Sequence, residues 1–267
     1  MMCRLYGVTR AGYYAWRRHT PGIRAQQNAV LVNEIVRVHA ASRSLYGSPR
    51  VHRQLQRQGV SAGENRVARL MRHHGIRARV ATIRYTVPAM KRFFADIPNR
   101  QHEHPADLPN EVWVGDITYL KVGTIYRYLA VVLDRCSRAV IGWSFGRRKD
   151  VALTLRALNR AVANRRPPPG LIFHTDRGIE YAAGAFRARL AELGITQSTN
   201  RPGKVTDNAF IESFFHSMKS EVIHGCSFTE DQQLLSVLRS YIPFYNRSRI
   251  HSSLDYVSPA TYEKQLA

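Results

Sequence analysis

Two aspartates lie at strand positions in the sequence from which they could carry out chemistry. Asp116 lies inside the apolar, β-rich run 112–120, so an ionisable group is placed in a strand where burial penalises its charge. Asp176 follows the short apolar run 171–175 and precedes Gly178, which places it at the C-terminal end of a second strand. We expect both carboxylates near strand ends of one sheet, where ligands of open α/β sheets gather.

A third acid, Glu212, falls in a stretch with helical periodicity over residues 207–219. Its apolar residues recur at the spacing of one buried helix face, namely Phe210, Ile211, Phe214, Phe215 and Met218. Asn208, His216 and Lys219 lie four residues before, four after and seven after Glu212, so we expect all of them on its face of the helix.

Convergence of these three acids would require a cation, because two unit charges 4 Å apart near a protein surface repel by about 4 kcal/mol. Hard oxygen ligands without thiolates select Mg²⁺ or Mn²⁺. The expected site therefore holds two such ions on Asp116, Asp176 and Glu212, and no zinc. Its chemistry would be phosphoryl transfer, in which one ion activates the attacking oxygen and the other stabilises the leaving oxygen. Any one of these acids alone is more often a structural or solvated residue.

The acids are separated by 60 and 36 residues, and Lys219 follows Glu212 by seven. Around them stand three motifs, which read Trp113-x-x-Asp116-Ile117-Thr118-Tyr119, His174-x-Asp176-Arg177-Gly178 and Asp207-Asn208-Ala209-x-x-Glu212-Ser213-Phe214-Phe215. Together they closely resemble the DDE catalytic core of retroviral-integrase-like transposases. Within that group the chain resembles the second-reading-frame product (OrfB) of the IS-three family of bacterial insertion sequences, over nearly its whole length.

The resemblance implies a DNA transposase that cuts and joins strands, with double-stranded DNA as its partner in the form of terminal inverted repeats and target DNA. It further implies a homo-oligomer on DNA and an upstream-frame OrfA protein, separate or fused. Lys219 would hold a terminal phosphate or base, with His216 and Asn208 as weaker candidates near the DNA. Arg249 and His251 lie in a stretch that resembles the family's C-terminal signature, and they either contact DNA or hold the tail in place.

The charge distribution indicates where DNA binds. The net charge is +21 and the pI is near 10.7, which favours a polyanionic partner. Residues 1–100 hold 19 basic and 3 acidic residues, a balance of +16 that leaves +5 for the rest of the chain. A GC-rich genome would explain arginine in place of lysine, but not a scarcity of acids in one part only. We therefore expect residues 1–100 to bind DNA.

Two helical segments are predicted in this basic region. Residues 1–22 show a turn at Gly7, a cap at Thr9 and an amphipathic helix, typical of the end of a helix-turn-helix cut short at its start, or alternatively of an ordinary surface helix. Residues 23–80 predict three short helices with a basic outer face, a second helix-turn-helix-like unit. The candidate DNA contacts are Arg10, Arg17, Arg18, Arg50, Arg66 and Arg69.

Residues 81–105 lose periodicity and are punctuated by prolines, so they predict a linker, ordered only against DNA or the core. Residues 106–267 predict the catalytic core with C-terminal helices, the last of them over 228–245. The order β-β-β-α-β-α-β-α suits a ribonuclease-H-like mixed α/β sheet. Asp134 is a strand-end carboxylate that could be mistaken for a ligand, but Ser137 and neighbouring arginines favour local hydrogen bonding.

The three cysteines, Cys3, Cys136 and Cys226, are far apart and odd in number, which indicates free thiols in a reducing compartment. The sequence has no signal-peptide pattern and no apolar run of membrane length, so we expect a bacterial cytoplasmic protein, nucleoid-associated when bound, with no membrane partner. Two alternatives remain open. One is a nuclease on the same sheet that only hydrolyses DNA, and the other is a DNA-binding regulator whose acids are structural.

Overall fold

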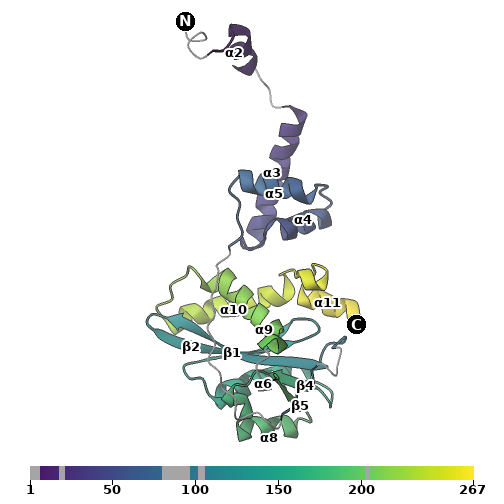
Figure 1. Cartoon of the computed structure of the whole chain (residues 1–267), viewed down its shortest axis with the longest axis vertical. Helices are drawn as coiled ribbons and strands as arrows, with labels where there is room; N and C mark the ends of the chain where they lie inside the picture. The colour runs from purple at the N-terminus through teal and green to yellow at the C-terminus, as the bar shows by residue number, and fades with distance from the viewer. Residues whose placement is uncertain (1–6, 18–21, 80–96, 102–105, 202–204) are drawn as a thin grey trace. The chain divides into compact units, whose positions relative to one another are not determined.

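The computed structural model describes residues 7–17, 22–79, 97–101, 106–201 and 205–267. The chain divides into two compact units, residues 1–78 and 79–267 (Figure 1).

The first unit is helical. Helix α2 (Arg10–Arg17) begins after Thr9, whose Oγ1 accepts a hydrogen bond from the Gly12 amide at 3.0 Å, as the predicted cap requires. Three further helices follow, α3 (Ile23–Ala41), α4 (Ser48–Arg57) and α5 (Glu64–His73). They pack together around buried apolar side chains, namely Leu31, Ile35, Val38, Val51, Leu55, Val67, Leu70 and Met71. The three helices predicted for residues 23–80 are confirmed.

The second unit is built on a five-stranded mixed sheet in the order β3-β2-β1-β4-β5. Its strands are β1 (Val112–Val122), β2 (Ile125–Asp134), β3 (Val140–Gly146), β4 (Ile172–Thr175) and β5 (Thr196–Thr199). The first three form an antiparallel meander, while β4 runs parallel to both β1 and β5. This topology puts β1, the strand of Asp116, at the centre of the sheet.

Helices cover both faces of the sheet (Figure 1). One face carries α6 (Val151–Arg165) and α8 (Gly184–Glu192), and α7 (Ile179–Ala182) packs against both of these helices. The opposite face carries α9 (Ala209–Met218), α10 (Asp231–Arg247) and α11 (Pro259–Leu266). The main apolar core lies between the sheet and the first group, around Trp113, Phe173 and Phe186.

Four details differ from the sequence-based expectation or extend it. The predicted order has a single helix between the strand before Asp176 and the next strand, whereas the structure has two, α7 and α8, separated at Ala183. The helix expected over 228–245 begins at Asp231, because the Glu230 side chain forms a capping box there with Gln233. Helix α11 was not predicted, although Ser258 caps it by accepting a hydrogen bond from the Thr261 amide at 3.2 Å. Finally, a π-helix (Lys219–Ile223) continues α9.

Part of the predicted linker lies against the core. The Thr199 amide donates to the Pro98 carbonyl at 3.3 Å, and the Arg100 amide donates to Ser198 Oγ at 2.8 Å. Residues 98–101 therefore lie alongside β5. Over the described part of the chain, no helix is both long and apolar enough to cross a membrane.

Helix α6 approaches β3 so closely that residue 142 has no room for a side chain. A Cβ atom at Gly142 would lie 2.4 Å from the Ala157 carbonyl oxygen and 2.7 Å from the Ala161 amide nitrogen. Gly142→Ala is expected to lower the free energy of unfolding by about 3 kcal/mol or more, because backbone rather than a flexible side chain must move. Urea denaturation measures this, with Gly184→Ala as control, since a Cβ there meets nothing within 4 Å. An equal effect of both substitutions would contradict the close contact.

Candidate active site

The sheet brings the two predicted aspartates side by side. Gly115 of β1 pairs with Thr175 of β4 in parallel register, so Asp116 and Asp176 are the next residues along two neighbouring strands. Such strands lie about 4.8 Å apart. Parallel pairing thus joins two acids that are 60 residues apart in sequence.

Backbone amides hold one oxygen of each aspartate. Asp116 Oδ1 accepts a hydrogen bond from the Ile117 amide at 2.7 Å, and Asp176 Oδ1 accepts one from the Gly178 amide at 2.9 Å. Each bond favours the charged form of its carboxylate and restricts its rotation. The two side chains are therefore oriented by the backbone itself.

The electrostatics of the site oppose the charge of these acids. Burial raises the pKa of Asp116 well above its ordinary value, and the neighbouring Asp176 carboxylate raises it further. Glu212 adds a smaller increase to the pKa of Asp116, while Lys149 lowers it. Burial also raises the pKa of Asp176. A cation between these carboxylates would remove the repulsion.

Glu212 belongs to the same electrostatic neighbourhood. It lies on α9, is exposed, and its pKa is raised by partial burial and then by Asp176. In the described chain, no three His, Cys, Asp or Glu side chains are close enough to share a metal ion in this conformation. The exposed Glu212 side chain can rotate without repacking the core. The donor set of carboxylate oxygens suits a hard divalent cation, so the residues fit Mg²⁺ or Mn²⁺.

Two charged residues near Asp176 were missed by the sequence analysis. Glu180 is 6% exposed, and its Oε2 lies 3.5 Å from Lys149 Nζ. Glu180 raises the pKa of Asp176, whereas Lys149 lowers it. A Cβ at Gly178 would lie 3.0 Å from Asp176 Oδ1 and 3.1 Å from Glu180 Oε2. Because glycine has no Cβ, both carboxylates can lie close to the backbone at this position. Glu180 could have been suspected from its place just past Gly178, but nothing in the basic run before α6 marks Lys149.

Lys219 faces Asp116 from the far end of α9. It is 7% exposed, and its Nζ lies 4.8 Å from the centroid of the Tyr119 ring. Burial lowers the pKa of Lys219, and the Asp116 carboxylate partly offsets this by raising it. Lys219 begins the π-helix, an element often found at functional sites.

The other two candidates on this helix differ from each other. His216 is exposed, one turn beyond Glu212. Asn208 is 1% exposed, and its Oδ1 has no hydrogen-bond partner within the described residues. Asn208 is therefore buried where Glu212 is exposed, which differs from the expectation that the two share one face of the helix. The reason is that α9 begins only at Ala209, so Asn208 lies in the preceding 3₁₀ turn (Val205–Asn208) and helical periodicity does not extend to it.

The arginines of the first unit fall into two groups. Three of the predicted DNA contacts are exposed, namely Arg10, Arg17 and Arg69. Two are half-buried, Arg50 over the Tyr46 ring at 5.9 Å and Arg66, whose Nε donates to Asn28 Oδ1 at 2.9 Å. Arg18 lies outside the described residues.

Asp134 is fully buried and bonded within its own turn. Its carboxylate accepts hydrogen bonds from the Asn110 amide at 2.7 Å, the Ser137 amide at 2.9 Å and Ser137 Oγ at 3.1 Å. The expected local hydrogen bonding is confirmed.

Known protein families match along most of the chain. A family model described as an HTH-like domain matches residues 24–84. Two models described as an integrase core domain match residues 106–205 and 212–266. Among solved structures, a simian T-cell lymphotropic virus intasome in complex with PP2A regulatory subunit B56 gamma has a TM-score of 0.52 and 19% identity, over 86% of this chain and 74% of that one. This likeness supports the integrase-like, ribonuclease-H-like fold.

Closer relatives come from bacterial insertion sequences. The insertion element IS600 uncharacterized 31 kDa protein of Shigella sonnei is 35% identical over 99% of this chain and 98% of its own length. The transposase InsF for insertion sequence IS3A of Escherichia coli (strain K12) is 36% identical over 99% of this chain and 93% of its own. The resemblance drawn from the motifs is thereby confirmed. The chain belongs to the IS-three family of DDE transposases, DNA-binding polynucleotidyl transferases that cleave and join DNA at the ends of a bacterial insertion sequence with the help of divalent metal.

Proposed function

We propose that Asp116, Asp176 and Glu212 are the catalytic carboxylates of this transposase and together hold two Mg²⁺ or Mn²⁺ ions. The observation that carries the proposal is that parallel pairing of β1 and β4 sets Asp116 beside Asp176. In addition, Asp176 and Glu212 both raise the pKa of Asp116, and Asp176 raises the pKa of Glu212. When bound, the ions would activate the attacking oxygen and stabilise the leaving oxygen of a phosphodiester.

Each residue would have a distinct role. Asp116, on the central strand, has its pKa raised by both other acids, so it would hold metal together with each of them. Asp176 and Glu212 would supply the remaining carboxylate oxygens. Lys219, which faces Asp116, would hold a DNA phosphate or base next to the acids, and the exposed His216 lies where it can support that contact.

A strand-transfer assay tests the assignment at Glu212. The substrate is an element-end duplex that already carries a 3′-hydroxyl, incubated with target DNA and Mn²⁺ or Mg²⁺. Glu212→Gln is expected to lower joining by about 10³-fold, the loss of about 4 kcal/mol of transition-state stabilisation. The matched control is Glu192→Gln on α8, an exposed acid paired with Arg189, which is expected to leave joining unchanged. Joining by Glu212→Gln at the control's rate would contradict the proposal.

Metal binding also predicts a pH-dependent stabilisation. Because the pKa of folded Asp116 lies above its unfolded value of 3.8, this group stabilises the fold most at low pH, and that stability is lost as pH rises through the raised pKa. Mg²⁺ is therefore expected to raise the thermal midpoint more at pH 8 than at pH 5. A ligand present at 100 times its Kd stabilises the folded state by about 2.7 kcal/mol. Calorimetry with and without EDTA measures this. A shift that is larger at pH 5 would contradict it.

We further propose that the chain works in the bacterial cytoplasm as a homo-oligomer on paired element ends, with an upstream-frame OrfA protein or as a fusion to it. The domain organisation that fits this role is residues 1–22 and 23–80 for DNA binding, 81–105 as linker and 106–267 as catalytic core. Family membership supports the proposal. Comparing end binding by this chain and by an upstream-extended version tests the OrfA requirement, and equal site-specific binding by both would count against it.

A further inference from the structure

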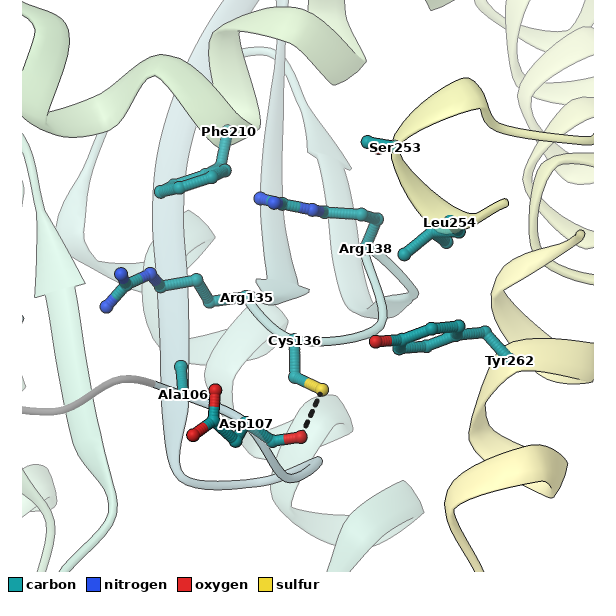
Figure 2. Close-up of a pocket in the computed structure, with 9 residues that line it drawn as sticks. All are labelled: Ala106, Asp107, Arg135, Cys136, Arg138, Phe210, Ser253, Leu254 and Tyr262. Carbon is teal, nitrogen blue, oxygen red and sulfur yellow. Dashed lines mark hydrogen bonds between the residues drawn. The ribbon is translucent and has the colours of Figure 1, made fainter. Parts of the chain in front are cut away.

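A basic cavity of about 370 Å³ lies in the second unit, beside the turn that joins β2 and β3 (Figure 2). The turn contributes Arg135 and Arg138, and the first turn of α9 contributes Phe210. Asp107, from the segment before β1, and Tyr262, from α11, also line the cavity, as do Ser253 and Leu254. Segments from five parts of the chain thus meet around two arginines.

Both guanidinium groups approach the same aromatic ring. The Arg138 Cζ lies 3.9 Å from the Phe210 centroid, and the Arg135 Cζ lies 5.3 Å from it. Burial lowers the pKa of Arg138, Tyr245 partly offsets this by raising it, and the nearby Arg135 charge again lowers it. Two like charges therefore converge in a partly desolvated place, where a bound anion would relieve their repulsion.

The contact with Phe210 leaves the hydrogen-bonding edges of Arg138 unused. A guanidinium carries five N–H donors in its plane, whereas stacking on a ring uses its face. Arg138 Nε and Nη1 are buried, and neither has an acceptor in the part of the chain that the structure describes. Buried donors of this kind are costly, and an acceptor would offset that cost.

The carboxylates nearest to Arg138 are committed elsewhere or lie at the rim. Asp134 accepts three hydrogen bonds from Asn110 and Ser137. Glu263 forms a two-point ion pair with Arg165 at 2.7 and 2.9 Å. Asp107 is exposed and acts on Arg135, so it only partly balances the charge of the cavity. Arg135 also donates from Nη1 to the Gln101 carbonyl at 2.6 Å, so of the two arginines it is Arg138 whose buried donors lack an acceptor among the described residues.

We propose that this cavity binds a backbone phosphate of DNA through Arg138, with the charge of Arg135 beside it. The planar fork of an arginine matches two phosphate oxygens, and the cavity is wide enough to admit such a group. The proposal takes its substrate from the family assignment and adds a contact outside the acid cluster. Both arginines lie against Phe210, which belongs to the same helix as Glu212. DNA held by the cavity would therefore lie next to the helix that carries the third acid.

The salt dependence of DNA binding tests the proposal without any need for catalysis. The full chain binds an element-end duplex in EDTA at several salt concentrations. Arg138→Gln is expected to reduce the slope of log K against log salt by about 0.9, the value for one lost phosphate contact. The matched control is Arg187→Gln on α8, an exposed arginine whose loss changes the net charge equally, and it is expected to keep the wild-type slope. Equal slopes for the two variants would overturn the proposal.

A second measurement separates DNA from free phosphate and guards against misfolding. Inorganic phosphate is expected to raise the thermal midpoint of the wild type and of Arg187→Gln, but not that of Arg138→Gln. A phosphate effect lost without any change in the DNA slope would mean a free-phosphate site and would overturn the DNA assignment. If Arg138→Gln does not fold, Arg138→Lys keeps the charge but not the fork, and an undiminished phosphate shift in that variant would overturn the proposal. Neither measurement depends on the acids, so failure here leaves the catalytic assignment intact.

Discussion

Asp116→Asn is expected to abolish strand cleavage and strand transfer while DNA binding is retained. The substitution replaces a charged metal ligand on the central strand by a neutral amide of the same shape, and Asp116 is the acid whose pKa both others raise. We expect both reactions to slow by at least about 10³-fold, or about 4 kcal/mol of transition-state stabilisation. Cleavage and joining assays with Mg²⁺ measure the loss, and a gel-shift assay in EDTA measures binding.

The control for this experiment is Asp255→Asn. Asp255 is exposed and has a φ of 48°, a left-handed conformation that asparagine adopts as readily as aspartate. It is expected to behave as the wild type. Without metal, Asp116→Asn is also expected to be more stable than the wild type near pH 8, because it removes a charge that burial and Asp176 disfavour. Full activity of Asp116→Asn would rule out its catalytic role, and loss of DNA binding together with activity would mean that the acid acts on the fold.

Arg249→Met is expected to lower the free energy of unfolding by about 3–5 kcal/mol, the cost of leaving one partner of a buried ion pair uncompensated. Arg249 is 3% exposed, and its Nη2 lies 2.6 Å from Glu221 Oε1. Its Nη2 also donates to Ser217 Oγ at 3.2 Å, and Tyr241 donates its hydroxyl to Glu221 Oε2 at 2.7 Å. This network joins the C-terminal tail to the π-helix that follows α9.

A double-mutant cycle in urea measures this coupling. Adding Glu221→Gln to Arg249→Met is expected to recover part of the stability, because the second substitution removes the uncompensated charge. Arg247→Met is the matched control, since Arg247 is exposed two residues earlier and its loss should change stability by less than about 0.5 kcal/mol. Additive effects of the two substitutions would contradict the coupling. The burial of Arg249 also resolves the choice left open by the sequence, because this side chain holds the tail to the core.

Local sequence patterns were sufficient to predict most of the helices and strands. The apolar runs around Asp116 and before Asp176 became β1 and β4, and Asp150 caps α6 by accepting a hydrogen bond from the Leu153 amide at 2.9 Å. Capping and strand alternation depend on residues a few positions apart, so they can be read along the chain. Helix α11 carries such a signal too, in the cap Ser258 and in Pro259 in its first turn.

No comparable sequence pattern indicates three other features of the structure. These are the π-helix, the burial of Asn208 and the pairing of Lys149 with Glu180. Each depends on which residues from distant segments pack against the element in question. Lys149 stands in a basic run that predicts only a solvated surface, and it becomes part of the site because α7 packs against α6. Periodicity specifies which side of an element is apolar, but not which partner will cover it.

The sequence by itself was enough to identify this protein as a DDE transposase of the IS-three family, since its three motifs closely resemble those of that family. Only the tertiary structure decided how the acids are oriented, which charges surround them, and that two arginines from the β2–β3 turn meet at Phe210 of α9. The physical reason is the range of the interactions. Strand and helix formation follow from neighbouring residues, whereas pKa values and anion pockets depend on charges and burial contributed by segments that meet only in the folded chain.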